Sequence, residues 1–314
     1  MNKKIYVAGH NGLVGSACIR VLKKKGYKNL IFRTSDELDL MNQKDVYDFL
    51  KKEKPYAIIN AAAKVGGIMA NKTYPYQFLL NNMLIQNNLI KSAFDLQIEK
   101  FIFLGSSCIY PKYSKQPIKE EYLLSDSLEP TNEFYAIAKI SGIKLIESLK
   151  KQYGLNYVSL MPTNLYGPKD NFDLNSSHVL PAMIRKFHDA KLKNSENITL
   201  WGTGKPMREF LYVDDLAEAI IFSLENQMPE HLYNVGTGID VKIIDLANKI
   251  KNIVGFNGKI VWNTKMPDGT PRKLMDSSKI NNLGWKHNTD LDEGIIKTFE
   301  WFKENINELR VVKF

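Results

Sequence analysis

The 314-residue sequence predicts an α/β protein with a doubly wound parallel sheet followed by a smaller α/β lobe. Three observations predict this fold class. Short apolar or β-branched runs alternate with longer amphipathic stretches in the first half of the chain. A glycine-rich turn follows the first apolar run. After residue 167 the sequence changes to an Asn/Asp/Ser-rich loop, which indicates the start of a second lobe.

The strands of the sheet are expected at apolar runs that are short and lack internal turn residues. These runs are residues 4–8, 30–33, 57–63, 100–106 and 156–161. Helices are expected between them, where apolar residues recur at helical spacing, in 14–25, 42–52, 75–96 and 135–153. Strands that alternate with helices in this way are joined by right-handed crossovers, so the sheet is expected to be parallel.

The chain is expected to divide near residue 167 into a first domain, 1–167, and a second lobe that is mainly 168–314. The second lobe should contain a helix at 178–191 and a strand at 198–201, followed by a mixture of short elements. The segments 209–224 and 232–237 are candidates to return to the first domain, so the boundary is not expected to be clean.

Composition and charge exclude several classes of partner. The net charge of +9 comes from lysines scattered singly or in short groups such as 23–25, which indicates a solvated surface suited to anionic ligands. No nucleic-acid-binding motif and no metal-ligand cluster is present, so neither partner is expected. No apolar run approaches ~18 residues, so no membrane span is expected. The two cysteines, Cys18 and Cys108, do not suggest a disulfide framework, which favours the cytoplasm.

The stretch "VAGHNGLVG" places Gly9, Gly12 and Gly15 between the first strand and the first helix. This spacing suits a tight turn at Gly9, a close backbone approach at Gly12 and helix packing at Gly15. Backbone N–H groups and the positive end of the helix would then face an anion. The turn therefore predicts a Rossmann domain that binds a dinucleotide pyrophosphate, although glycines alone would also fit a surface turn.

The end of the second strand, "FRTSDELDL", indicates the preferred cofactor. NAD-specific sites usually offer a carboxylate to the ribose 2′-hydroxyl here, but this chain has Arg33. A guanidinium suits a 2′-phosphate, so NADP(H) is favoured over NAD. A surface arginine without a ligand is the alternative. Asp39 and Leu40 follow closely and are expected to border the adenine.

The stretch "YAIAK" places Tyr135 and Lys139 one helical turn apart on the same face. A phenol with a pKa of ~10 is a poor acid–base catalyst at neutral pH, and a neighbouring ammonium would lower that pKa. The order of motifs strengthens the catalytic interpretation of this pair, because a strand that ends in serine hydroxyls precedes it in the chain. Ser106 and Ser107 could both hydrogen-bond a substrate carbonyl, and Ser106 is favoured.

These motifs resemble those of the extended short-chain dehydrogenase/reductases, a family of nucleotide-sugar epimerases, dehydratases and reductases. The resemblance extends over nearly the whole chain, because "REFLYVDDLAEAI" (208–220) and "YNVGTG" (233–238) are similar to later motifs of the family. Within the family, the branch that makes GDP-L-fucose is resembled most closely. The stretches that carry this resemblance are "AAAKVGGI", "GSSCIYP", "EPTNEFYAIAKISGIKL", "MPTNLYGPKDNF", "SSHVLPAMIRKFH" and "PDGTPRK".

The resemblance implies epimerisation at carbons 3 and 5 of GDP-4-keto-6-deoxy-D-mannose, followed by NADPH-dependent reduction of the 4-ketone. It implies that Ser106, Tyr135 and Lys139 serve the reduction and that Cys108 and His178 exchange the protons. A thiol of pKa ~8.5 and an imidazole of pKa ~6.5 suit the removal and return of protons beside a held ketone. Without the resemblance, Cys108 fits a small buried apolar residue and His178 a helix-start residue.

The resemblance also implies the ligand contacts. The expected cofactor contacts are Gly9, Asn11, Gly12, Leu13, Val14, Gly15, Arg33, Asp39, Leu40, Ala62, Leu104, Lys139, Pro162, Asn164, Leu165 and His178. The expected substrate contacts are Ser107, Asn164, Lys186, Trp201, Arg208 and Asp268. Lys186 alone would also fit a solvated helix residue. Asn11 and Ser35 stand where family members often carry basic residues that hold the 2′-phosphate, so the NADP preference depends mainly on Arg33.

Two alternatives remain open at the level of sequence. One is a reductase that acts only on the 4-ketone of a related GDP-sugar, such as a GDP-6-deoxy-heptose. The other is a non-catalytic dinucleotide-binding module, against which the intact Ser/Tyr/Lys set argues. A homodimer is expected from the resemblance and from the two long helices at 75–96 and 135–153.

Overall fold

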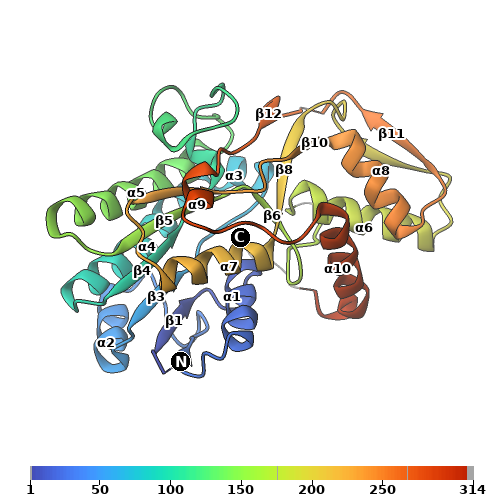
Figure 1. The fold of residues 1–314 in the computed structure, drawn as a ribbon. Helices are drawn as coiled ribbons and strands as arrows, with labels where there is room; N and C mark the ends of the chain where they lie inside the picture. Colours follow the sequence, from blue (N-terminus) through green and yellow to red (C-terminus); the bar gives the residue numbers. More distant parts are fainter. Residues whose placement is uncertain (1, 175, 267, 310–314) are drawn as a thin grey trace.

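A computed structural model describes residues 2–174, 176–266 and 268–309. Its main sheet has six parallel strands in the order β2-β1-β3-β4-β5-β9, which confirms the expected doubly wound sheet (Figure 1). The strands are β1 (Ile5–Ala8), β2 (Leu30–Ile31), β3 (Ala57–Asn60), β4 (Lys100–Leu104), β5 (Tyr157–Pro162) and β9 (Leu232–Val235). The strand order reverses beside β1, and ligands bind at the carboxyl ends of the strands at such a reversal.

Helices cover both faces of this sheet (Figure 1). On one face lie α1 (Leu13–Lys24) and α7 (Val213–Glu225), and on the other α2 (Gln43–Glu53), α4 (Pro75–Asp95) and α5 (Glu133–Tyr153). Alternate strand residues enter the two cores: Ile5 of β1 packs on the α1 side and Tyr6 on the α2 side. Because both faces are covered, the short strands are apolar throughout rather than alternating.

The second lobe has its own apolar core. Its longer helices are α6 (Val179–Leu192), α8 (Ile243–Val254) and α10 (Leu291–Glu304). Its strands are β6 (Asn164–Tyr166), β7 (Asn197–Trp201), β8 (Met207–Tyr212), β10 (Asp240–Lys242), β11 (Lys259–Asn263) and β12 (Arg272–Lys273). They form the sheet β10-β8-β12, in which β6 also pairs with β8, and the pair β11-β7. Two short helices, α3 (Ile68–Thr73) and α9 (Ser278–Asn282), complete the α-helices of the described chain.

Two features of the C-terminal half bear on the sequence expectations. The helices α8 and α10 are longer than the short elements expected there, because Leu246, Ala247 and Ile250 give α8 a buried apolar face. β9 joins the main sheet beside β5, and α7 packs against α1, so parts of the chain beyond residue 208 lie against the first domain.

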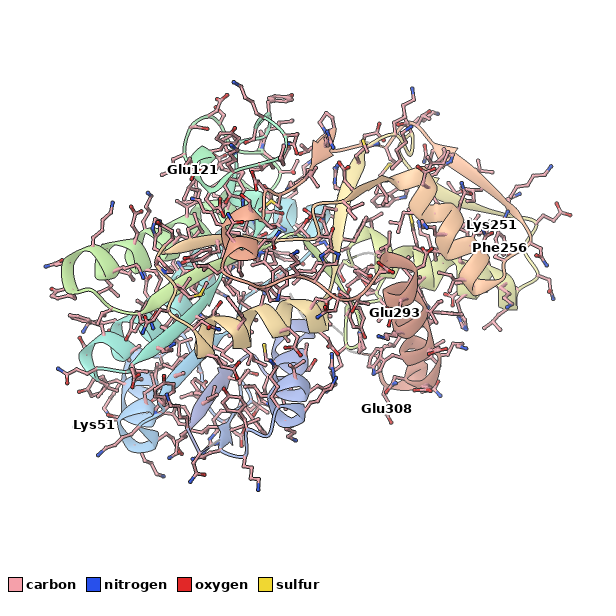
Figure 2. All side chains as sticks on the ribbon, in the orientation of Figure 1. Lys51, Glu121, Lys251, Phe256, Glu293 and Glu308 are labelled. Carbon is pink, nitrogen blue, oxygen red and sulfur yellow. The ribbon has the colours of Figure 1, made fainter. Side chains whose placement is uncertain are left out.

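The charged side chains are distributed over the surface. Lys51, Glu121 and Glu293 are exposed and point outward from the ribbon (Figure 2). Most ion pairs in the described chain are partly or largely exposed, so each contributes little to stability. No helix in the described chain is long and apolar enough to cross a membrane.

Candidate functional site

The glycine turn between β1 and α1 has the geometry of a phosphate cradle. Gly9 has φ +79°, and a Cβ there would lie 2.7 Å from backbone atoms of Ala61 and Ala62. A Cβ at Gly15 would lie 2.2 Å from the Gly9 carbonyl oxygen. Gly12 precedes α1 without a side-chain cap, and the first turn of the helix has no acidic residue. The uncapped helix end and the missing side chains therefore fit the pyrophosphate of a dinucleotide.

Arg33 lies just after β2 and is already engaged by protein groups. Its Nη1 donates to the Phe32 carbonyl at 2.8 Å, and its Nη2 lies 3.4 Å from Glu53 Oε1. His10 of the glycine turn stacks on Phe32 with the ring centroids 4.7 Å apart. A 2′-phosphate at this position would therefore find the Arg33 guanidinium beside the glycine turn. It would compete with the Glu53 carboxylate for that guanidinium.

Other expected cofactor contacts lie near the same sheet edge. The Asp39 carboxylate accepts from the Met41 N–H at 2.9 Å, and the Leu40 carbonyl accepts from Asn88 Nδ2 at 3.0 Å. Pro162 ends β5, and Asn164 begins β6. Asn164 Nδ2 donates to the Glu209 carbonyl at 2.7 Å, which fixes the amide and leaves its oxygen available to a ligand.

Tyr135 and Lys139 lie on α5, and both side chains are buried. The Lys139 ammonium donates to the Leu104 carbonyl at the end of β4 at 2.8 Å and lies 5.8 Å from the Tyr135 ring centroid. Burial lowers the pKa of Lys139 to about 8. Burial also raises the pKa of Tyr135 well above its usual range. The expectation that Lys139 lowers the phenol pKa is therefore wrong in this structure, because desolvation raises that pKa and the Lys139 ammonium donates to the Leu104 carbonyl.

The turn after β4 brings Cys108 to this pair. Ser106 caps a 3₁₀ turn over Ser107–Ile109, and its hydroxyl accepts from the Cys108 N–H at 3.4 Å. Ser106 keeps partial exposure, whereas Ser107 is buried. Cys108 and Tyr135 belong to one small buried cluster. Burial raises the pKa of Cys108, and the nearby Lys273 ammonium, the Ser106 hydroxyl and Lys139 oppose that rise.

His178 precedes α6 and keeps solvent access. Partial loss of hydration lowers its pKa, and the Lys273 ammonium lowers it further. Cys108 and His178 thus share one neighbouring cation. Lys273 was not among the residues expected at the site; its signal in the sequence is the basic pair at the end of "PDGTPRK". Within the described chain no carboxylate lies at ion-pair distance from the Lys273 ammonium.

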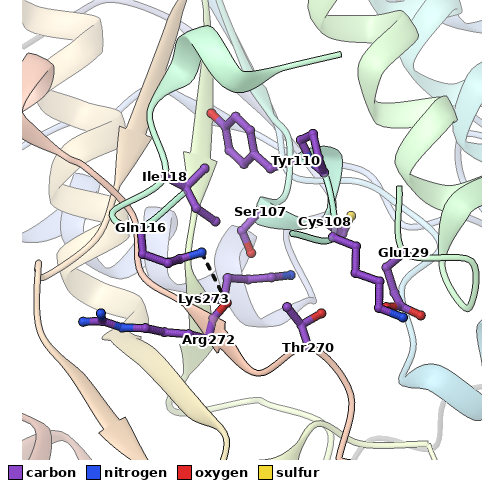
Figure 3. Close-up of a pocket in the computed structure, with 11 residues that line it drawn as sticks. Ser107, Cys108, Tyr110, Gln116, Ile118, Glu129, Thr270, Arg272 and Lys273 are labelled. Carbon is purple, nitrogen blue, oxygen red and sulfur yellow. Dashed lines mark hydrogen bonds and ion pairs between the residues drawn. The ribbon is translucent and has the colours of Figure 1, made fainter. Parts of the chain in front are cut away.

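A small cavity adjoins Cys108 and Lys273 (Figure 3). Its volume of about 10 Å³ is enough for one water molecule. In Figure 3 the Lys273 side chain runs toward Ser107 and Cys108, and Gln116 lies beside Arg272, whose carbonyl accepts its amide N–H at 3.4 Å. The strand β12 is therefore fastened beside the turn that carries Cys108.

The residues expected to hold the nucleotide lie in the second lobe. Lys186 Nζ lies 5.6 Å from the Trp201 ring centroid, and the indole is 52% exposed. Arg208 and Lys273 are direct neighbours in the paired strands β8 and β12, so their side chains share one face. The Asp268 carboxylate accepts from the Thr203 N–H and hydroxyl at 2.7 Å each, so it is occupied with holding the adjacent turn.

One further buried titratable group, in the loop before α6, was missed. Asp170, in the loop before α6, is 6% exposed, and its Oδ1 accepts from the Asn171 N–H at 2.7 Å. Oδ2 has no hydrogen-bond partner within the described chain. Burial raises the pKa of Asp170 to about 7. The sequence "YGPKDNF" gives no signal of this burial, because it depends on how the loop packs.

Comparison with known proteins places this geometry in a family. A model described as the NAD dependent epimerase/dehydratase family matches residues 5–236. GDP-L-fucose synthase 1 of Arabidopsis thaliana is 54% identical over 303 residues, which cover 96% of this chain and 94% of that protein. The resemblance to this family in the sequence is thereby confirmed.

Solved structures of relatives are also similar over nearly their full length. A GDP-6-OMe-4-keto-L-xylo-heptose reductase from C. jejuni has a TM-score of 0.91 at 40% identity, covering 97% of this chain and 98% of that chain. A GDP-L-fucose synthetase from Naegleria fowleri bound to NADP has a TM-score of 0.91 at 30% identity, covering 98% and 95%. The chain therefore belongs to the NAD dependent epimerase/dehydratase family.

Proposed function

We propose that this chain is an NADP-dependent oxidoreductase that converts GDP-4-keto-6-deoxy-D-mannose to GDP-L-fucose. It epimerises carbons 3 and 5 and reduces the ketone at carbon 4. The observation that carries the proposal is the gathering of Cys108, Tyr135 and Lys139 at the carboxyl end of β4, with Lys273 beside them. The 54% identity to a GDP-L-fucose synthase over 96% of the chain supports the same conclusion.

Epimerisation requires acidic protons beside a held ketone. Ser106 and Tyr135 are proposed to hydrogen-bond the 4-keto oxygen, which stabilises the enolate that forms when a flanking carbon loses its proton. The lowered pKa of His178 and the raised pKa of Cys108 favour a neutral imidazole and a protonated thiol. A proton removed on one face of the sugar by one group can then be replaced on the other face by its partner.

Reduction requires a proton donor for the developing alkoxide. The raised pKa of Tyr135 keeps the phenol protonated at neutral pH, so Tyr135 is proposed to donate this proton. The buried Lys139 ammonium donates to the Leu104 carbonyl at the end of β4, and Lys139 is proposed to hold the nicotinamide ribose there. Bound NADPH supplies the hydride. The glycine turn is proposed to hold its pyrophosphate and Arg33 its 2′-phosphate.

The substrate diphosphate is proposed to bind among Lys186, Arg208 and Lys273, and the exposed Trp201 ring to face the rest of the GDP group. A homodimer is proposed because α4 and α5 lie side by side and expose apolar residues, including Leu84 and Ile137. Light scattering on the purified protein tests the dimer. Free thiols at both cysteines agree with a reducing compartment, so a cytoplasmic location is proposed.

The deciding experiment incubates the protein with NADPH and GDP-4-keto-6-deoxy-D-mannose in deuterated water. NADPH absorbance reports reduction, and mass spectrometry with NMR reports deuterium at carbons 3 and 5. The proposal predicts NADPH oxidation and label at both carbons. NADPH oxidation without label would identify a reductase alone. The absence of both NADPH oxidation and label would contradict an enzymatic role on this substrate.

The second candidate is a C-4 reductase of a GDP-linked heptose. The structural similarity to the C. jejuni heptose reductase supports it, but the Naegleria fowleri protein has the same TM-score. The higher sequence identity to a GDP-L-fucose synthase favours the hexose. Comparing kcat/KM for the two 4-keto sugars distinguishes them.

A further inference from the structure

Glu209 is a fully buried carboxylate in β8, next to Arg208. No lysine or arginine in the described ranges forms an ion pair with it. Its oxygens accept backbone N–H groups instead: Oε2 from Met275 at 2.9 Å and Oε1 from Gly238 at 2.7 Å. Oε1 also accepts a longer bond from the Thr237 hydroxyl at 3.4 Å. Burial raises the pKa of Glu209, and these N–H groups oppose the rise. A buried charge without a cation is costly unless such donors stabilise it, so this arrangement demands an explanation.

The two backbone donors belong to separate segments of the chain. Met275 lies two residues after Lys273, and Gly238 lies in the turn between β9 and β10. The carboxylate also fills the available space, because a Cβ at Gly236 would lie 2.3 Å from Glu209 Oε1. The side chain thus ties the strand of Arg208 to the segment of Lys273 and to the β9–β10 turn.

The place of Lys273 depends on few other bonds to β8. β12 pairs with β8 over only two residues, Arg272 and Lys273. Arg272 makes a bidentate ion pair with Asp240 at 2.6 and 3.2 Å, but Asp240 lies in β10, so this pair does not join Lys273 to β8. On its other side the segment pairs with Ile118, through bonds that do not involve β8. The Glu209 carboxylate therefore adds a buried side-chain link between β8 and the segment of Lys273 to this two-residue pairing.

We propose that Glu209 is a positioning residue that holds the Lys273 ammonium beside Cys108 and His178. Glu209 does not contact the substrate itself. This inference rests on the proposed function, in which Cys108 and His178 exchange protons with the sugar. Displacing Lys273 would remove a positive charge from the neighbourhood of both groups. The proton-exchange step should therefore change, whereas NADPH binding should not.

The test uses Glu209→Gln. Glutamine keeps the shape of the side chain but turns one acceptor into a donor that faces a backbone N–H, so one of the two bonds from backbone N–H groups is lost. Since Lys273 lowers the pKa of His178, its displacement should raise that pKa toward the ordinary value. We expect the acid limb of the pH profile for deuterium exchange to move to higher pH, and exchange near pH 6 to fall several-fold. The NADPH dissociation constant should be unchanged.

Gly236→Ala is a second variant that pushes the same carboxylate without altering its charge, and it should move the limb in the same direction. Asp215→Asn is the matched control. The buried Asp215 carboxylate also accepts two backbone N–H groups, those of Asn288 and Thr289 at 3.1 Å each, but away from the site. The control should reduce stability and leave the pH profile in place.

NMR titration of the His178 imidazole in the free protein provides a readout that does not require activity. It separates the role of Glu209 from the epimerase function. A wild-type protein without deuterium exchange would refute the epimerase function, but the His178 titration would still test the role of Glu209. An unchanged His178 titration in both Glu209→Gln and Gly236→Ala would overturn the role of Glu209. So would an equal change in Asp215→Asn.

Discussion

The buried carboxyl of Asp170 should make the stability of this protein fall as pH rises through the neutral range. Its pKa is raised from 3.8 to about 7, because the side chain is 6% exposed and no cation among the described residues compensates its charge. Below pH 4 the carboxyl is protonated in both the folded and the unfolded chain. Between pH 4 and pH 7 the unfolded chain loses this proton and the folded chain retains it, so the free energy of unfolding declines.

The size of the effect follows from the difference between the two pKa values. At about 1.4 kcal/mol per pKa unit, a pKa of about 7 against 3.8 gives about 4 kcal/mol as an upper limit. Asp170→Asn removes the titration. It adds a buried amide N–H₂ whose lost hydrogen bonds cost about 1–3 kcal/mol, but this cost is the same at every pH. The variant should therefore gain stability relative to the wild type between pH 5 and pH 8.

Urea unfolding at pH 5, 6, 7 and 8 measures this gain. The control is Asp126→Asn, because Asp126 also accepts the N–H of the following residue, at 2.6 Å, but is exposed. A difference in unfolding free energy between Asp170→Asn and the wild type that stays constant from pH 5 to pH 8 would refute the reasoning. It would mean that the Asp170 carboxyl is hydrated or paired in solution.

Three further predictions concern the ligand sites. Gly9→Ala should weaken NADPH binding more than tenfold, as measured by fluorescence titration. The new Cβ would clash with the Ala61 backbone, and the positive φ adds a cost of ~1–2 kcal/mol. Gly26→Ala is the control that should leave binding intact, because Gly26 has φ +83° and nothing within 4 Å of the added Cβ. Arg33→Ala should raise the dissociation constant of NADPH about tenfold and leave that of NADH unchanged, and equal losses would contradict a 2′-phosphate contact. Cys108→Ser should reduce deuterium exchange about 100-fold while NADP-dependent oxidation of GDP-L-fucose continues, since that reverse step needs no epimerisation; loss of both would contradict the assignment.

The parts of the site that local sequence encodes could be predicted. Gly9 and Gly15 act through backbone geometry within one turn, and Tyr135 and Lys139 lie one helical turn apart, so both features were visible in the sequence. The direction of the Lys139 ammonium could not be predicted, because it depends on the Leu104 carbonyl of a distant strand. The effect of burial on the Tyr135 pKa was missed because the burial depends on packing against Phe78 and Cys108 of other elements.

Features that depend on pairing between distant segments were also missed. Lys273 reaches the site because β12 pairs with β8 beside Arg208, and a two-residue strand leaves almost no signal in sequence. The short helix α3 depends on the Gly67 N–H, which donates to the Ser176 carbonyl across the fold. By contrast, α8 was within reach, because the spacing of Leu246, Ile250 and Val254 is helical.

The proposed chemistry depends on the Tyr135 phenol as proton donor to the ketone oxygen. The measurement is single-turnover NADPH oxidation by Tyr135→Phe with GDP-4-keto-6-deoxy-D-mannose, together with the NADPH dissociation constant. We expect the rate of hydride transfer to fall at least about 100-fold while NADPH binding is unchanged, because the ring stays and only the hydroxyl is lost. Hydride transfer at the wild-type rate in Tyr135→Phe would contradict the proposed chemistry.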